Sequence, residues 1–195
     1  MRALTPGRRA ILGALALSAC GPTRLPPVNG QAKGRVVVFR GFVNFFSTGM
    51  NILAAQLRLA GWDASVHNHV EWEEQARAAL AAGPALARPF AIIGHSLGAD
   101  TALRMSGRLG QQGLAADLLV TFDPHILLDL PRGARRVVNF YQGNESIDRV
   151  LRPARDFDGT LEQRRDDRNG HLTIDKDTTL HAEVLRMLDA IRAGS

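Results

Sequence analysis

The pentapeptide GHSLG at residues 94–98 has the composition of a turn that presents a nucleophilic serine. It follows the apolar run 90–93 and precedes a run of helical character at 100–105. A strand that turns sharply into a helix holds the serine in a strained conformation, and glycines two positions before and after it leave room for the turn. The spacing therefore predicts that Ser96 is a nucleophile above the edge of a sheet, with an ordinary glycine-flanked turn as the alternative.

A serine hydroxyl needs a base to take its proton and a third group to orient that base. In a doubly wound sheet these partners lie at the carboxyl ends of later strands, in the chain order serine, acid, histidine. Asp123 directly follows the apolar run 118–122, and Pro124 ends strand pairing there. Asp123 is therefore the predicted acid. Asp148, after the next strand, is the second candidate and Glu145 the third.

Six histidines are candidates for the base. Four are unsuitable because they precede the serine, lie inside its turn or follow the acid too closely: His67, His69, His95 and His125. His171 follows an Asn-Gly loop signal, and a loop is what a catalytic histidine needs to reach the serine. His181 lies in the final helical run, where a solvated or half-buried histidine is the ordinary expectation. His171 is the predicted base, and His95 is expected to pack beside the nucleophile.

The oxyanion of a tetrahedral intermediate needs preorganised donors, each worth roughly 3 kcal/mol of barrier. The backbone N–H of Leu97 is one donor by its position after the nucleophile. The second is expected from the loop after the first strand, where Gly41 allows close approach and the N–H of Phe42 follows. Phe42, Phe45 and Phe46 are predicted to line an acyl pocket, with core packing as the alternative for the last two.

The elements that must position these residues alternate along the chain. Apolar runs predict strands at 35–39, 62–67, 90–93, 118–122 and 135–142. Helical patterns cover 50–60, 71–82, 100–105 and 180–191. This order predicts an α/β fold: a three-layer, doubly wound, mainly parallel sheet covered by helices on both faces.

The sequence DFDGT at residues 156–160 matches the aspartate signature of haloacid-dehalogenase-type phosphatases. In those enzymes the first aspartate ends a buried strand, but residues 151–155 are not an apolar run. The segment is interpreted as a polar turn in a loop from 143 to 170. The spacing of its acidic residues demands no cation, so neither a metal nor another cofactor is predicted.

The N-terminus has the pattern of an export signal. Arginines precede the short apolar run 10–17, which is too short to span a bilayer, and small residues follow it. The sequence LSAC, ending at Cys20, resembles the lipobox of bacterial lipoproteins, in which the cysteine is lipidated. We expect a signal peptide at 1–19, a tether at 20–34 and one folded domain at 35–195. The alternative is ordinary signal cleavage nearby, and the pair Arg8-Arg9 hints at twin-arginine export.

From this organisation we expect the protein to lie in the bacterial cell envelope, on the periplasmic side and anchored to a membrane through Cys20. Removing residues 1–19 takes away three arginines and lowers the formal charge from +5 to +2, which does not favour a nucleic-acid partner. Cys20 is the only cysteine of the 195 residues, so no disulfide forms within the chain. With 45% hydrophobic residues, the chain can build the core of one domain.

The GHSLG turn, Asp123 and His171, in this order, resemble the α/β-hydrolase superfamily, particularly its small lipase- and thioesterase-like members. Segments 40–50 and 121–124 are similar to a bacterial branch of exported hydrolases, and the similarity extends over about 35–191. The resemblance implies a compact fold and acyl transfer in which Ser96 attacks, His171 shuttles the proton and Asp123 orients the imidazole.

The substrates that this resemblance implies are small-molecule esters, thioesters or lipids. Few residues separate the helix after Ser96 from Asp123, so no lid is evident. Arg40 stands where a histidine often precedes the oxyanion glycine in lipases. The alternative function is an envelope lipoprotein that keeps the hydrolase fold and binds a ligand without catalysis.

Overall fold

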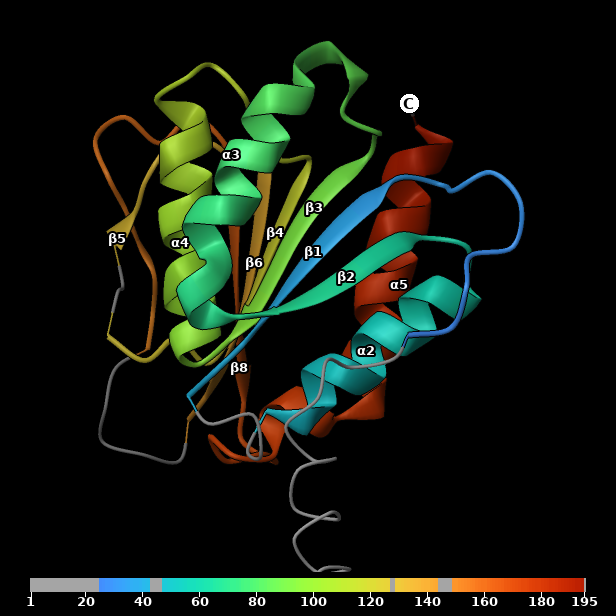
Figure 1. The fold of residues 1–195 in the computed structure, drawn as a ribbon. Coiled ribbons are helices and arrows are strands. Elements are labelled where there is room, and N and C mark those ends of the chain that lie inside the picture. Colours follow the sequence, from blue (N-terminus) through green and yellow to red (C-terminus); the bar gives the residue numbers. More distant parts are fainter. Residues whose placement is uncertain (1–24, 43–46, 127–128, 144–148, 195) are drawn as a thin grey trace, which may run out of the picture.

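A six-stranded parallel sheet forms the centre of the protein, seen in Figure 1. The computed structural model describes residues 25–42, 47–126, 129–143 and 149–194. The strand order is β2-β1-β3-β4-β6-β8, and every neighbouring pair is parallel. The strands are β1 (Arg35–Arg40), β2 (Asp63–Asn68), β3 (Phe90–His95), β4 (Leu118–Phe122), β6 (Arg136–Gln142) and β8 (Thr160–Asp166). Two short strands, β5 (Asp129–Leu130) and β7 (Arg152–Pro153), pair with each other in a separate sheet.

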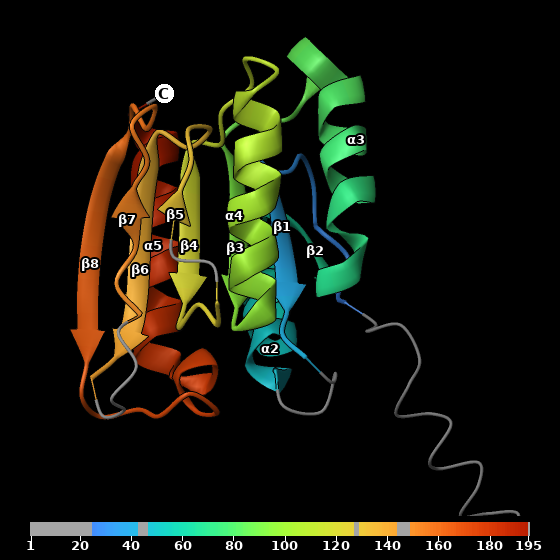
Figure 2. The ribbon, with the colours of Figure 1, turned by 90° about the vertical axis from the view of Figure 1, so that its left-hand side faces the viewer.

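Helices cover both faces of the sheet. They are α2 (Thr48–Leu59), α3 (Trp72–Ala82), α4 (Leu97–Gly110) and α5 (Thr178–Ala193), with 3₁₀ turns at η1 (His69–Glu71), η2 (Gly83–Ala85) and η3 (Ile174–Lys176). Figures 1 and 2 show α3 and α4 on one face and α2 and α5 on the other. The predicted three-layer, doubly wound fold is confirmed. Among the residues described here, no helix combines the length and the apolar character needed to cross a bilayer.

Two hydrophobic cores, one on each face, explain the continuous apolar runs of the strands. In β1, Val36 and Val38 pack into the core under α2 and α5, whereas Val37 and Phe39 pack into the core under α3 and α4. A strand buried on both faces cannot alternate apolar and polar residues, so its sequence reads as an unbroken apolar run. This is why β4 could be predicted with the bounds that the structure has.

The predicted loop at 143–170 is wrong in part, because residues 160–166 form the edge strand β8. Its sequence, TLEQRRD, lacks an apolar run because its side chains are mostly half-exposed at the edge. Glu162 pairs with Arg136 of the neighbouring strand and with Arg164 of its own strand. Charged side chains on an edge strand also oppose pairing with another chain, so a polar sequence is physically consistent with this position.

The aspartate signature at 156–160 does not end a buried strand. Among the described residues, the strand before it is the exposed two-residue β7; residues 155–156 form a turn, and Thr160 is the first residue of β8. The interpretation of this motif as a polar turn is confirmed.

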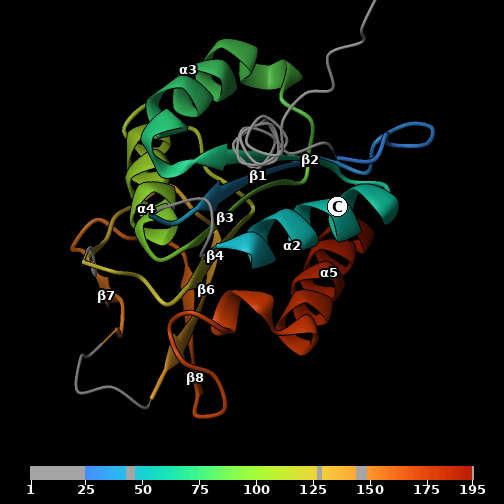
Figure 3. The same cartoon turned by 60° about the horizontal axis from the view of Figure 1, so that its bottom comes forward.

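The carboxyl ends of the six strands lie at one edge of the sheet, the lower edge in Figure 2, which Figure 3 brings forward. The loops that follow β1, β3 and β4 begin there, and the loop that carries His171 follows β8. The fold therefore brings the sequence-predicted site residues to a common edge.

The described part of the predicted tether, 25–34, lies against the domain. Leu25 packs on the core under α2 and α5, and the N–H of Lys33 donates to the carbonyl of Gly61 at 2.9 Å. Residues 1–24, and with them the predicted signal peptide and Cys20, lie outside the described residues. The domain boundaries stay a prediction.

Candidate active site

Ser96 occupies the sharp turn between β3 and α4. Its backbone has φ 56° and ψ −125°, a conformation that L-residues rarely adopt. A Cβ at Gly94 would lie 2.1 Å from the carbonyl oxygen of Gly98, and a Cβ at Gly98 would lie 2.4 Å from that of Phe39. Only glycine fits these two positions, so the strained strand–turn–helix unit follows from the two glycines that flank the serine.

Three predicted site residues form one chain of hydrogen bonds. The hydroxyl Oγ of Ser96 lies 2.9 Å from Nε2 of His171, and Nδ1 of His171 lies 2.5 Å from Oδ2 of Asp123. An ionised carboxylate only accepts hydrogen bonds, so Nδ1 of a neutral His171 carries the proton and Nε2 accepts from the serine. In this arrangement the imidazole is ready to take the hydroxyl proton of Ser96.

Asp123 is fully buried and held by several partners at once. Its φ is 51°, and its N–H donates to the carbonyl of Phe140 at 2.7 Å. The backbone N–H and the side-chain amide of Gln142 donate to its carboxylate at 3.1 and 3.2 Å. The buried guanidinium of Arg149 forms an ion pair with it, with 3.2 Å between Nε and Oδ2. The carboxylate of Asp123 is therefore shielded from solvent, fixed by these partners and hydrogen-bonded to His171.

The sequence did not indicate Gln142 or Arg149 as part of the site. Gln142 ends β6, the strand beside the one that Asp123 follows, so its position at the carboxyl end was an available signal. Arg149 gave no such signal, because it lies beyond the end of β6 and no local pattern shows that its side chain is buried beside Asp123.

The rejected histidines lie elsewhere or play other roles. His181 is buried on α5, where Nε2 donates to the carbonyl of Asp175 at 2.7 Å, and burial lowers its pKa. His67 contacts the Ser65 hydroxyl through Nε2. His125 lines the same cavity as Ser96, with its ring centroid 6.2 Å from that of His171. The alternative acids Asp148 and Glu145 lie outside the described residues.

A cavity of about 400 Å³ opens onto Ser96. Its lining consists of Phe42, Ser47, His95, Ser96, Leu97, His125, His171 and Leu172. None of these described lining residues is a lysine, arginine, aspartate or glutamate, and their side chains supply apolar groups, hydroxyls and imidazoles. Phe45 and Phe46, predicted to line an acyl pocket, lie outside the described residues.

The two predicted oxyanion donors are both at this cavity. Leu97 is the first residue of α4, where backbone N–H groups are not used by the helix and the helix dipole is positive. A Cβ at Gly41 would lie 3.0 Å from Cβ of Ser96, so only glycine allows this close approach of the loop. The N–H of Gly41 donates to Ser47 at 3.0 Å, which leaves Phe42, next along the chain, as the candidate donor from this loop.

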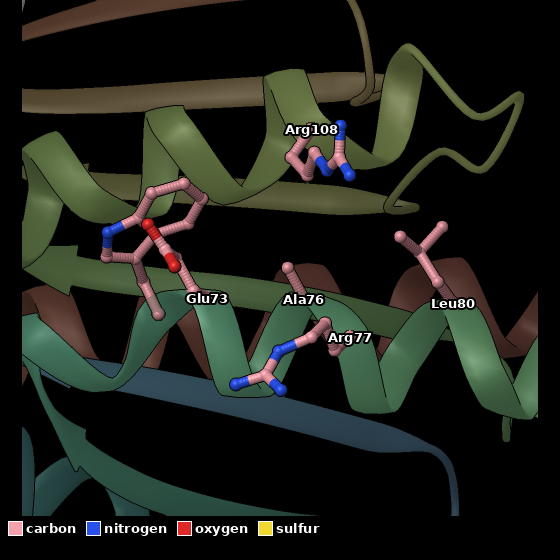
Figure 4. A pocket seen from close by; sticks show the side chains of 6 residues that line it. Glu73, Ala76, Arg77, Leu80 and Arg108 are labelled. Atoms are coloured by element: carbon pink, nitrogen blue, oxygen red, sulfur yellow. The ribbon is translucent and has the colours of Figure 1, made fainter.

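Figure 4 shows a different hollow, between α3 and α4. Its volume is about 360 Å³. Ala76, Leu80, Glu73 and Arg77 of α3 line it together with Arg108 of α4. Its lining contains no serine, cysteine or histidine, so it lacks a nucleophile and a base. Within the described part of the chain, no group of three or more histidine, cysteine, aspartate or glutamate residues is arranged to hold a metal ion.

The fold and the strained serine turn define an α/β hydrolase. The profile of the thioesterase domain family matches residues 28–129, more than half of the chain. The protein belongs to the thioesterase domain family, which places it among the hydrolases of esters and thioesters. A search of curated proteins gives no match.

Solved structures share the fold. YbtT, a type II thioesterase from the yersiniabactin biosynthetic pathway, is 10% identical with a TM-score of 0.53, over 85% of this chain and 97% of its own. Esterase PE8 is 17% identical with a TM-score of 0.53, over 84% and 96% of the two chains. A structure from Xanthomonas campestris pv. campestris, assigned to the α/β-hydrolase superfamily, is 14% identical with a TM-score of 0.50, over 81% and 100%.

Proposed function

We propose that this protein hydrolyses carboxylic esters or thioesters through an acyl-enzyme on Ser96. The observation that supports this most directly is the hydrogen-bonded chain from Ser96 through His171 to Asp123, which opens into a cavity. A serine, a base and an orienting acid at hydrogen-bond distance are the parts that nucleophilic acyl transfer requires.

Acylation begins when Ser96 Oγ attacks the carbonyl carbon and its proton passes to Nε2 of His171. The bond between carbonyl carbon and Ser96 Oγ forms, and the carbonyl oxygen becomes an oxyanion that the N–H groups of Leu97 and Phe42 stabilise. The tetrahedral intermediate then expels the alkoxide or thiolate, which takes the proton from His171. The acyl group remains as an ester of Ser96.

Deacylation repeats these steps with water. The water oxygen attacks the acyl carbon while His171 takes a proton from the water. His171 then gives this proton to Ser96 Oγ when the ester bond breaks. Asp123 keeps its negative charge throughout, holds the tautomer of His171 and stabilises the imidazolium that forms twice in each cycle. The products are a carboxylic acid and the free alcohol or thiol.

The cavity lining supports an uncharged acyl group as the part of the substrate that lies there. Among the described residues, the lining offers no cation for a carboxylate or phosphate and no carboxylate for an amine. YbtT is a thioesterase and PE8 an esterase, and both leaving groups fit the mechanism. Thioesters, small esters and lipid acyl esters are therefore the substrates to assay.

Hydrolysis of p-nitrophenyl butyrate and of a short acyl-thioester by purified protein tests the proposal. Wild type is expected to turn over at least one of them, and Ser96→Ala and His171→Ala are each expected to lower kcat at least about 1,000-fold. His181→Ala is the matched control, a histidine on α5 whose loss should leave kcat nearly unchanged. Wild-type protein that is folded but hydrolyses neither substrate would favour the binding-protein alternative.

We also propose that the protein is exported and anchored in the cell envelope through a lipid on Cys20. The support is the sequence of residues 1–20: arginines, a short apolar run and LSAC. Growth with labelled palmitate and fractionation of the cells should place wild type in the membrane fraction with label. Cys20→Ser should lose both. Label-free wild-type protein in the soluble fraction would contradict the proposal.

A further inference from the structure

Ser47 immediately precedes α2, the position where a serine side chain usually caps a helix. Here its hydroxyl makes no capping hydrogen bond to the helix. Instead, Oγ accepts from the N–H of Gly41 at 3.0 Å and lies 2.8 Å from Nδ1 of His95, and the side chain is buried. Instead of capping the helix, the Ser47 hydroxyl thus makes two contacts at the candidate active site.

The direction of every hydrogen bond in this group follows from its partners. The carbonyl oxygen of His171 lies 2.8 Å from Nε2 of His95, and a carbonyl only accepts, so Nε2 carries a proton. In a neutral ring Nδ1 is then an acceptor. Ser47 Oγ already accepts from Gly41, so its own proton is the one that points to Nδ1 of His95. One tautomer of His95 satisfies all three contacts.

The surroundings of His95 keep its ring neutral. Its side chain is 1% exposed, and burial lowers its pKa to about 4. The carboxylate oxygen Oδ2 of Asp175 lies 4.0 Å from Nδ1, beyond hydrogen-bond distance, and accepts from the N–H of Gly49. A neutral ring with a fixed tautomer can act as a rigid bridge between the two loops at its ends.

We infer that Ser47 and His95 are positioning residues. They hold the oxyanion loop at 41–42 and the loop of His171 in the correct position relative to Ser96. The inference deepens the proposed function and rests on it for its catalytic meaning. His95 directly precedes the nucleophile, so the bridge connects the serine turn to both loops. It acts on the backbone of His171 and not on its ring, so it contributes placement and carries no proton in the reaction.

Ser47→Ala is the first test. It removes the acceptor for the N–H of Gly41 and the donor for His95, and no helix cap is lost with it. Misplacing a catalytic group by about 1 Å lowers the rate by up to about 100-fold. We therefore expect kcat to fall about 10- to 100-fold with KM little changed. Ser47→Thr keeps the hydroxyl and should restore kcat. Ser106→Ala, a buried serine of α4 outside the cavity lining, is the control and should retain wild-type kcat.

Two substitutions of His95 separate the ends of the bridge. An asparagine amide occupies the place of Nδ1 and keeps the contact with Ser47, whereas a glutamine amide reaches the place of Nε2 and keeps the contact with the His171 carbonyl. Each variant should lose part of kcat, and Ser47→Ala should cost less in the His95→Gln background than in wild type. A folded Ser47→Ala protein with kcat within twofold of wild type, or with only KM raised, would overturn the inference.

A readout independent of activity keeps the inference separate from the proposed function. Long-range ¹H–¹⁵N NMR of labelled protein near pH 7 should show His95 as a neutral ring with its proton on Nε2 in wild type. A proton on Nδ1 would contradict the bridge even in an active enzyme. Wild-type protein with the expected tautomer but without Ser96-dependent turnover would refute the proposed function and, with it, the catalytic meaning of the bridge.

Discussion

Arg149→Met removes the guanidinium that faces Asp123 in the interior. The two side chains are 5% and 0% exposed, and Nε lies 3.2 Å from Oδ2. At this separation and an effective dielectric constant of about 20, the Coulomb attraction is about 5 kcal/mol. Breaking a buried pair from one side typically costs 3–5 kcal/mol, because the remaining charge is left uncompensated.

The structure places the expected loss at the lower end of that range. The carboxylate of Asp123 keeps two donors from Gln142 and one from His171 when the guanidinium is removed. The guanidinium also donates to the carbonyl of Pro124 at 2.6 Å, and this bond is lost too. We therefore expect Arg149→Met to lower the free energy of unfolding by about 3 kcal/mol at pH 7.

Urea denaturation followed by circular dichroism measures this loss. Arg135→Met is the matched control, because Arg135 pairs with Asp117 at 2.8 Å but is 69% exposed, and should cost less than about 1 kcal/mol. In the Asp123→Asn background, Arg149→Met should cost at least about 1.5 kcal/mol less than in wild type. Equal costs for Arg149→Met and Arg135→Met, or additive effects in the double variant, would refute this account of the buried pair.

Asp123→Asn should lower kcat by about 10,000-fold without unfolding the protein, because the amide favours the wrong tautomer of the base, and kcat within tenfold of wild type would contradict this role. Gly94→Ala places a Cβ 2.1 Å from a backbone oxygen and should cost at least about 2 kcal/mol in thermal denaturation, whereas Gly170→Ala, with no atom nearer than 4.0 Å, should be nearly neutral. Burial raises the pKa of Asp175 to about 6 and lowers that of His95 to about 4. Protonated Asp175 stabilises the folded protein, and this contribution is lost as pH rises through about 6. Neutral His95 also stabilises it, and this contribution is lost as pH falls below 6.5 toward 4. The two contributions therefore change in opposite directions with pH. The Asp175→Asn variant keeps only the contribution of His95. Between pH 6.5 and 4.5, its free energy of unfolding should therefore fall about 2 kcal/mol more than that of wild type. Equal changes in the free energy of unfolding of the two proteins over this pH range would contradict this prediction.

The sequence predicted the elements that are buried on both faces, because their apolar runs and glycine-flanked ends carry the necessary signal. It also indicated which side chains would meet. Ser96 and Asp123 follow adjacent parallel strands, so their proximity follows from the strand order. His171 was the histidine that comes after both in the chain and follows a loop signal. The structure brings these three together, and their catalytic role stays a prediction.

What the sequence missed depends on contacts that local patterns do not encode. Strand β8 is polar because it lies at an edge and pairs its charges. Arg149 has the sequence context of an ordinary surface arginine, and only the structure shows its side chain buried against Asp123. Ser47 has the sequence position of a helix cap, and only the structure shows that its hydroxyl bonds Gly41 and His95 instead.

Labelling with a fluorophosphonate probe tests directly whether Ser96 is an activated nucleophile. The probe forms a covalent bond with an activated serine, and digestion followed by mass spectrometry identifies the modified residue. Wild type should be labelled on the peptide containing Ser96, Ser96→Ala should not be labelled, and His171→Ala should be labelled far more slowly. Folded wild-type protein that remains unlabelled, or is labelled equally in Ser96→Ala, would contradict this role of Ser96.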